Sequence, residues 1–117
     1  MKFYYNDKLI RTSKTHEYKF AAMLDGKCLK CSATREGAQA EITRSLNECQ
    51  SRIDFEKIIL EALEKGETRV RAKNGPWVKL DPEWHTLENM LERIEKHKER
   101  MAYIREHAEV VELEARQ

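Results

Sequence analysis

The chain has 117 residues, a length typical of one domain, and its 22 Lys and Arg residues against 21 Asp and Glu residues leave a net charge of +1. A charge so close to zero does not favour a basic nucleic-acid carrier or an acidic tail, and 40% hydrophobic with 37% charged residues argues against a disordered or membrane-embedded chain. Charged residues interrupt the first ten positions, and no apolar run approaches about 20 residues. We therefore expect no signal peptide, no membrane partner and a cytoplasmic location.

Residues 1–33 are predicted to form a small antiparallel β-sheet, because short apolar runs alternate with polar positions and turn residues. Asn6 and Asp7 tolerate the left-handed backbone that closes a tight hairpin. Asp25 and Gly26 form the sequence signal of a type I′ turn, which predicts a second hairpin.

The second hairpin also has a predicted register and a predicted buried face. A two-residue turn at Asp25 pairs Leu24 with Lys27, and regular pairing then continues with Ala22 opposite Leu29 and Phe20 opposite Cys31. The residues expected to share the buried face are Tyr18, Phe20, Ala22, Leu24, Leu29 and Cys31.

Two long helices and a basic hairpin are predicted after the sheet. Thr34 can cap a first helical turn and Gly66 can end a helix in the left-handed conformation, which predicts a helix over residues 34–65. Residues 66–80 read as a basic β-hairpin, and Asp81 followed by Pro82 predicts the start of a second, heptad-like helix over residues 81–108. Residues 109–117 contain β-branched residues and an alternation of apolar and charged positions, so we expect them to form a last strand.

The predicted fold class is therefore α+β, in a single domain over residues 1–117. It consists of a small antiparallel β-sheet plus a long antiparallel two-helix hairpin, with the basic hairpin between the helices. At about 1.5 Å per residue the first helix would run about 45 Å, whereas a body of about 100 residues has a radius of gyration of about 13 Å. The helices would overhang the sheet and expose apolar stripes that monomers rarely tolerate, so we expect a homodimer or a higher oligomer.

The charge is unevenly distributed along the chain. Residues 1–33 carry +4 and residues 66–80 carry +3, whereas residues 34–65 carry −2 and residues 81–117 carry −4. An anionic ligand is therefore expected where the strands and the basic hairpin meet the helices.

The cysteines and His97 are predicted to have structural roles. Cys28 and Cys31 form a CxxC pattern, but residues three apart on a strand point to opposite faces, so we expect no metal site and no cofactor. His97 falls at an apolar seam position of the second helix. A buried base or pH switch is one interpretation, and a hydrogen bond across a helix interface is the one we favour.

Two segments carry residue types that bind phosphates and bases. Residues 11–16 are six consecutive hydrogen-bond donors, which could cradle phosphates or serve equally as a polar edge strand. Trp77 in the basic hairpin could stack on a nucleobase, or it could cap the end of the helical hairpin. Because glycine-rich phosphate loops are absent from the sequence, any nucleotide would be held by side chains. The candidate ligand-binding residues of these segments are Arg11, Thr12, His16, Arg69, Arg71 and Trp77.

The second helix contributes three more candidates, Asn89, Arg93 and Arg105. Asn89 and Arg93 are four residues apart and share a helix face, and an Asn side chain can read the edge of adenine. An ordinary solvated helix surface is the competing interpretation for each of them singly. Trp84, in the first predicted turn, is expected in the core.

A family resemblance gives these residues a concrete context. The segment FYYNDKLIRTSKTHEY, residues 3–18, and the segment VVELEAR, residues 110–116, resemble small phage proteins of Firmicute hosts, and more narrowly the first family of anti-Thoeris proteins. The resemblance covers about the first 32 and the last 8 residues, and the helical middle only in pattern. Members of that family are sponges: they bind cyclic ADP-ribose isomers made by TIR-domain defence enzymes and hold them intact. Some relatives also bind cyclic oligonucleotides.

The resemblance implies a phage anti-defence protein that acts in the bacterial cytoplasm, with a small anionic cyclic nucleotide and a second copy of itself as partners. It also implies a small sheet with two long helices, in agreement with the pattern above. Two other function classes remain open: a protein inhibitor of a host nuclease, which would use the helical hairpin, and a small nucleic-acid-binding protein, which would use the basic sheet face. An enzyme is the least favoured class, because no nucleophile or paired acid lies at a triad-like spacing from His97.

Overall fold

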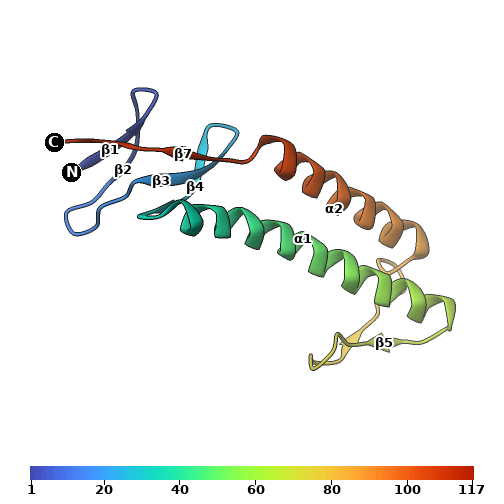
Figure 1. Cartoon of the computed structure of the whole chain (residues 1–117). Helices are drawn as coiled ribbons and strands as arrows, with labels where there is room; N and C mark the ends of the chain where they lie inside the picture. Colours follow the sequence, from blue (N-terminus) through green and yellow to red (C-terminus); the bar gives the residue numbers. More distant parts are fainter. The chain divides into compact units, whose positions relative to one another are not determined.

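Two tight turns organise the N-terminal part of the computed structural model, which describes residues 1–117 (Figure 1). Strands β1 (Lys2–Tyr5) and β2 (Lys8–Thr12) flank a turn in which Asn6 and Asp7 have φ angles of 48° and 62°. Strands β3 (Phe20–Leu24) and β4 (Lys27–Ser32) flank Asp25 and Gly26, with φ angles of 54° and 73°. Two successive positive φ angles define a type I′ turn, so both predicted hairpins are confirmed.

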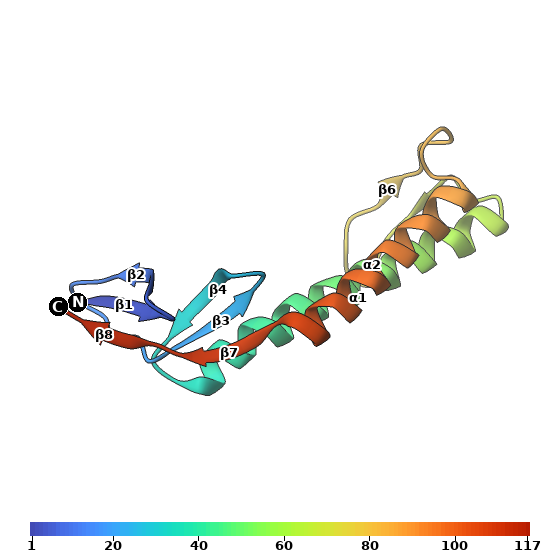
Figure 2. The same cartoon turned by 90° about the horizontal axis from the view of Figure 1, so that it is seen from above.

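The C-terminal residues divide the predicted single sheet into two. Strand β7 (Glu109–Glu112) pairs with β3 in a sheet of order β4-β3-β7, and β8 (Glu114–Arg116) pairs with β1 in a sheet of order β2-β1-β8 (Figure 2). Both pairings are antiparallel. The α+β class is therefore confirmed, with two three-stranded sheets in place of one.

The pairing of β3 with β4 contains a β-bulge that the predicted register lacks. The pair next to the turn, Leu24 with Lys27, is as predicted, but Leu29 is an extra residue with no partner on β3. The predicted pairs beyond it are therefore wrong by one position. The observed pairs are Ala22 with Lys30, Ala21 with Cys31 and Phe20 with Ser32.

The bulge changes which side chains share a face. Cys28 lies opposite Met23 and Cys31 lies opposite Ala21, two positions apart on β3, so both thiols fall on the same side of the sheet. Their Sγ atoms are 3.4 Å apart, and the prediction that they face opposite ways is wrong. Leu29 is 38% exposed, so its predicted burial is also wrong. The buried cluster at this sheet consists of Ala21, Met23, Cys31 and Val111.

Helix α1 (Arg35–Glu64) has the two ends that its sequence predicts. The Oγ1 atom of Thr34 accepts a hydrogen bond from the Gly37 amide at 3.0 Å, as an N-cap does. Gly66 follows the helix with φ of 73°, and the amide of Glu67 donates to the Ala62 carbonyl at 2.9 Å. This is a Schellman ending, which turns the chain toward the next strand.

Helix α2 (Leu87–His107) begins later than predicted. Asp81 begins a separate turn that precedes the helix, and in this turn its amide donates a hydrogen bond to Nδ1 of His85 at 2.7 Å. Thr86 is the N-cap residue, because its Oγ1 accepts a hydrogen bond from the Asn89 amide at 3.1 Å. The predicted start at Asp81 is therefore wrong. Neither helix has the length and apolarity that crossing a membrane requires.

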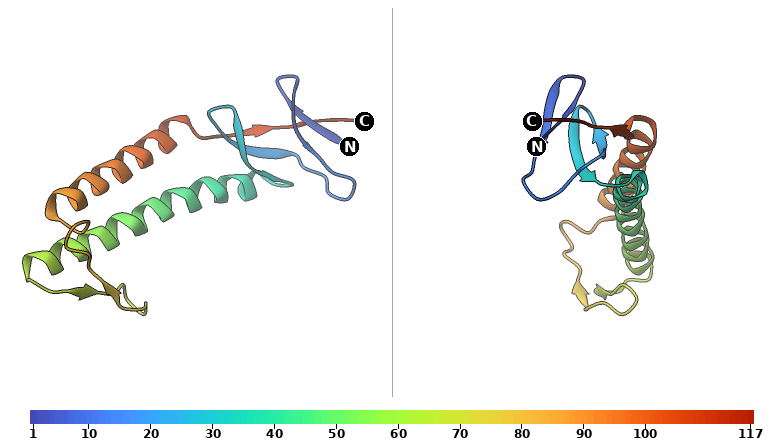
Figure 3. Two further views of the ribbon diagram at one scale, coloured as in Figure 1. Left: turned by 180° about the vertical axis from the view of Figure 1, so that it is seen from behind. Right: turned by 60° about the vertical axis from the view of Figure 1, so that its left-hand side comes forward.

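The chain divides into two compact units: a sheet unit, Met1–Leu46 with Tyr103–Gln117, and a hairpin unit, Asn47–Ala102. In the sheet unit Phe3 is fully buried and contacts Tyr18 edge-on, with 5.5 Å between ring centroids. In the hairpin unit, α1 and α2 run side by side in opposite directions, and the segment between them folds back beside α1 (Figures 2 and 3).

One charged side chain is buried in the hairpin unit, that of Glu56, which is 5% exposed. Its Oε1 atom accepts a hydrogen bond from Nε of Arg93 at 2.8 Å and lies 3.5 Å from Nε2 of His97. Both partners come from α2, so His97 lies at the helix interface as predicted, but it faces a carboxylate and makes no hydrogen bond through Nε2. An uncompensated carboxylate at this position would be costly, so Arg93 couples the two helices.

Replacing Arg93 by Ala is expected to lower the free energy of unfolding by about 1–3 kcal/mol, because the buried Glu56 loses its charged donor. Glu56→Leu should be close to neutral or stabilising, since an apolar side chain needs no partner there. Urea denaturation of both variants and of the double variant measures the coupling. If Arg93→Ala costs as much in the Glu56→Leu background as in the unchanged chain, the two side chains are not coupled.

Candidate functional site

The basic hairpin of residues 66–80 carries the site and is anchored by apolar residues. Strand β5 (Arg69–Val70) pairs with β6 (Val78–Lys79), with Val70 opposite Val78, so the predicted basic hairpin is present. Val70 and Leu80 are 3% and 6% exposed and pack against Ile59 and Ala62 of α1 and Met90 of α2. Because alternate strand residues point to opposite sides, burial of Val70 directs Arg69 and Arg71 away from this core.

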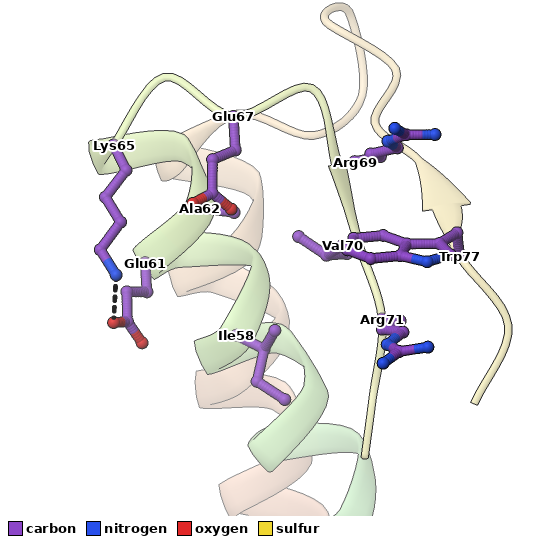
Figure 4. A pocket seen from close by; sticks show the side chains of 9 residues that line it. All are labelled: Ile58, Glu61, Ala62, Lys65, Glu67, Arg69, Val70, Arg71 and Trp77. Atoms are coloured by element: carbon purple, nitrogen blue, oxygen red, sulfur yellow. Dashed lines mark hydrogen bonds and ion pairs between the residues drawn. The ribbon is translucent and has the colours of Figure 1, made fainter. Parts of the chain in front are cut away.

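Trp77 lies between these two arginines. The guanidinium carbon of Arg69 is 5.3 Å from the centroid of the indole ring, and that of Arg71 is 5.1 Å from it. Figure 4 shows the two side chains on either side of the ring. Trp77 is nevertheless 57% exposed, so it does not cap the helical hairpin as a core residue would. We call Arg69, Trp77 and Arg71 the Arg-Trp-Arg cluster.

The cluster borders a pocket of about 230 Å³ between the hairpin and the end of α1. The α1 side of this pocket is formed by Ile58, Glu61, Ala62 and Lys65 (Figure 4). These residues were not among the sequence candidates. Their spacing of three, four and seven places them on one helix face, which is the signal that could have identified them.

The cations of this pocket differ in how far they are already neutralised. Lys65 donates to Oε1 of Glu61 at 2.9 Å, and this hydrogen bond raises the pKa of the Lys65 amine. The guanidinium groups of Arg69 and Arg71 lie over the indole ring and form no ion pair. Arginine on an aromatic face keeps its donors directed outward, so both groups can bind an anion.

Asn89 and Arg93 form a second, separate group around Trp84. The Nδ2 atom of Asn89 donates to the Trp84 carbonyl at 2.9 Å, and the Arg93 guanidinium carbon lies 5.6 Å from the centroid of the Trp84 ring. Arg93 is also the partner of Glu56. Trp84 is 49% exposed, so its expected place in the core is wrong.

The donor run of residues 11–16 lies in the sheet unit and is organised around Tyr18. The Arg11 guanidinium carbon lies 5.1 Å from the centroid of the Tyr18 ring, and the His16 ring stacks on it at 5.9 Å. His16 also contacts Thr15 through Nδ1 at 2.9 Å. Thr12 is exposed at the end of β2, and Arg105 is exposed near the C-terminus of α2. Arg11 and His16 thus share one aromatic ring.

The structure therefore places most of the nine candidates in three groups, each around one aromatic residue: Trp77, Trp84 and Tyr18. Only the group at Trp77 combines unpaired cations with a pocket lined by the same residues. No set of three or more His, Cys, Asp or Glu side chains lies close enough to share a metal ion.

Known proteins give no match to this chain: no family model, no curated protein and no solved structure is similar to it.

The position of the basic hairpin depends on the left-handed Gly66. Gly66→Ala is expected to lower the free energy of unfolding by about 1 kcal/mol, because a Cβ atom disfavours φ of 73° although the space around it is empty. Gly66→Asn is the matched control and should cost less, since Asn tolerates this conformation. Thermal unfolding monitored by circular dichroism measures both, and an equal loss for Ala and Asn would contradict the conformational explanation.

Proposed function

We propose that this protein binds a small anionic cyclic nucleotide, of cyclic ADP-ribose type, and sequesters it without hydrolysis. The observation that carries the proposal is the Arg-Trp-Arg cluster, in which two unpaired guanidinium groups border an open pocket. A guanidinium binds a phosphate through two parallel hydrogen bonds, and an indole ring can bind a base by stacking. Both parts of a nucleotide thus have a complementary group here.

The arrangement of the cluster favours the contact of the guanidinium groups with a phosphate over the contact of the indole ring with a base. Because Arg69 and Arg71 lie on either side of the indole, a nucleobase reaches a ring face only by displacing one guanidinium. Phosphate binding needs no such displacement. The proposed affinity therefore depends chiefly on the arginines, with Trp77 holding them in place.

The family resemblance supports the biological half of the proposal. The segments at residues 3–18 and 110–116 resemble anti-Thoeris proteins, whose members keep a cyclic nucleotide signal from its effector. On this proposal the protein is a phage product that acts in the cytoplasm of an infected bacterium. Cyclic oligonucleotides are a second ligand class that the same resemblance suggests.

A different observation favours a protein partner as the second candidate function. Trp84, Leu87 and Leu91 in the hairpin unit are 49%, 47% and 58% exposed, and the two leucines are one helical turn apart. Exposed apolar side chains that are neighbours on a surface are typical of an interface. A protein inhibitor of a host nuclease would use this face of the hairpin unit.

Isothermal titration calorimetry against cyclic ADP-ribose isomers, cyclic dinucleotides and a random DNA duplex tests the proposal. At least one cyclic nucleotide should bind with a Kd below about 10 µM. Heating the complex should release the ligand unchanged, as judged by chromatography. A cleaved product, or duplex binding without nucleotide binding, would overturn the sponge model.

Variants of the cluster locate the binding site. Trp77→Ala should weaken binding by about tenfold to a hundredfold, because both guanidinium groups lose the ring that holds them, and Arg71→Ala should have a similar effect. Arg71→Lys should restore only part of the affinity, because a point charge cannot replace the planar fork. Arg52→Ala is the matched control, since Arg52 is an exposed arginine of the same unit that is paired with Glu48. A loss of binding in the control would show a nonspecific charge effect.

We also propose that the protein is a homodimer or a higher oligomer, with the exposed face of Trp84, Leu87 and Leu91 as the contact between copies. Sedimentation equilibrium at tens of micromolar should give at least twice the chain mass of 13.9 kDa. Leu91→Glu should shift the mass toward the monomer, because it places a charge in the contact. A monomer in the unchanged protein would leave this face to a partner of another kind.

A further inference from the structure

Cys28 and Cys31 are placed side by side by the bulge in β4. Leu29 has no partner on β3, and this extra residue shifts the alternation of β4 by one position. As a result, Cys31 lies on the same side of the sheet as Cys28. The two Sγ atoms are 3.4 Å apart and in hydrogen-bonding contact. A small movement of either side chain is therefore enough to bring the sulfur atoms to bonding distance.

The two thiols have different environments. Cys28 is exposed, whereas Cys31 is 5% exposed within the cluster of Ala21, Met23 and Val111. Burial is the main reason that the pKa of the Cys31 thiol is raised to about 12, and the hydrogen bond with Cys28 adds to it. The guanidinium of Arg11 acts in the opposite direction and lowers that pKa. Cys28 can thus meet a reagent from solution, and Cys31 cannot.

We propose that Cys28 and Cys31 form a redox pair that a small disulfide, such as glutathione disulfide, converts into an intramolecular disulfide. Cys28 is the entry point because it is exposed, and Cys31 is the resolving thiol because it lies in contact with Cys28. The proposal does not depend on the nucleotide site, which lies in the other unit of the chain.

The exchange takes place in two steps. The Cys28 thiolate attacks one sulfur of glutathione disulfide, a mixed disulfide forms, and the first glutathione leaves as a thiolate that takes up a proton. Cys31 then loses its proton to solvent and attacks the Cys28 sulfur, and the second glutathione leaves. Two protein thiols are oxidised to one disulfide, and one glutathione disulfide is reduced to two glutathione molecules.

The second step is the slow one, and Arg11 assists it. The raised pKa keeps the Cys31 thiol protonated at pH 8, so its reaction depends on its position against the Cys28 sulfur, and the Arg11 cation favours its thiolate. Arg11 also lies over the Tyr18 ring at the edge of the donor run. A disulfide removes the thiol that Arg11 acts on, so oxidation alters the surroundings of this donor run.

The test uses the full chain with Cys49→Ser, which leaves only the two thiols of interest. The protein is incubated with glutathione disulfide at pH 8, quenched with acid, and then treated with N-ethylmaleimide in a neutral denaturant, so that every remaining thiol can react. We expect an intact mass lower by two hydrogen atoms, with neither glutathione nor maleimide attached. Trypsin should then release residues 28–30 and 31–35 as one linked pair of peptides.

Three variants separate the roles of the residues. Cys31→Ala should stop at a stable glutathione adduct on Cys28, and Cys28→Ala should leave Cys31 unmodified under the same conditions. Arg11→Ala should slow the second step and so prolong the mixed disulfide, because the Cys31 thiolate loses a cation that favours it. Circular dichroism of each variant confirms that it is folded, and Cys31→Ser provides a second variant of the buried thiol.

The proposal is overturned if the chain with both thiols stops at the glutathione adduct while Cys31→Ala forms that adduct fully. It is also overturned if both thiols still react with maleimide when the treated chain is denatured. Equal rates of the second step with and without Arg11 would remove Arg11 from the mechanism and leave the pair intact.

Discussion

The carboxylate of Glu56 is the constraint on which the hairpin unit depends. It is the single charged side chain that is buried, and burial of a carboxylate is unfavourable unless a cation reaches it. Arg93 supplies that cation from α2, and this fixes which turn of α2 lies against which turn of α1. Apolar seams alone tolerate sliding by one helical turn, whereas a buried ion pair permits one register. The same register sets Met90 against Val70 and Leu80, so the basic hairpin is held through packing that Glu56 helps to align.

Arginine contacts with aromatic rings recur along the chain. They explain how a protein with a net charge near zero keeps guanidinium groups on its surface that no carboxylate neutralises. Surface ion pairs such as that of Arg52 with Glu48 neutralise charge locally and contribute little to stability. At Trp77 the ring takes the place of a carboxylate: it contacts both guanidinium groups and leaves their charge unneutralised. Their positions are therefore defined without a bound anion, and for the proposed ligand this would reduce the entropy lost on binding. The net charge of +1 thus conceals a local concentration of positive charge at the hairpin.

The sequence predicts the features that neighbouring residues determine, such as turns and helix ends. It does not predict the features that depend on contacts between distant segments. The turns at Asn6 and Asp25 and the ends of α1 depend on local backbone preferences, and all of them were predicted correctly. Asp81 fits the N-terminus of a helix and of a single turn equally well, and the capping hydroxyl of Thr86 decides for the later start. The partner of Glu56 lies 37 residues away on another helix, so no pattern along α1 alone identifies it. Likewise, the sequence assigns Arg69, Arg71 and Trp77 to one basic hairpin, but it does not indicate which face of α1 completes the pocket.

The bulge at Leu29 shows how one extra residue can change chemistry as well as packing. Without it, the period of two would place Cys28 and Cys31 on opposite faces, and a redox pair would be impossible. Residues 21–24 of β3 are all buried, so both faces of that strand are covered. The apolar residues of β4 can therefore be buried without a regular alternation along β4. Leu29 is exposed in this arrangement, whereas Cys31 is buried in the core beside Val111. The position of the thiol pair therefore follows from how the core of the sheet unit is filled, which no local pattern around the cysteines reveals.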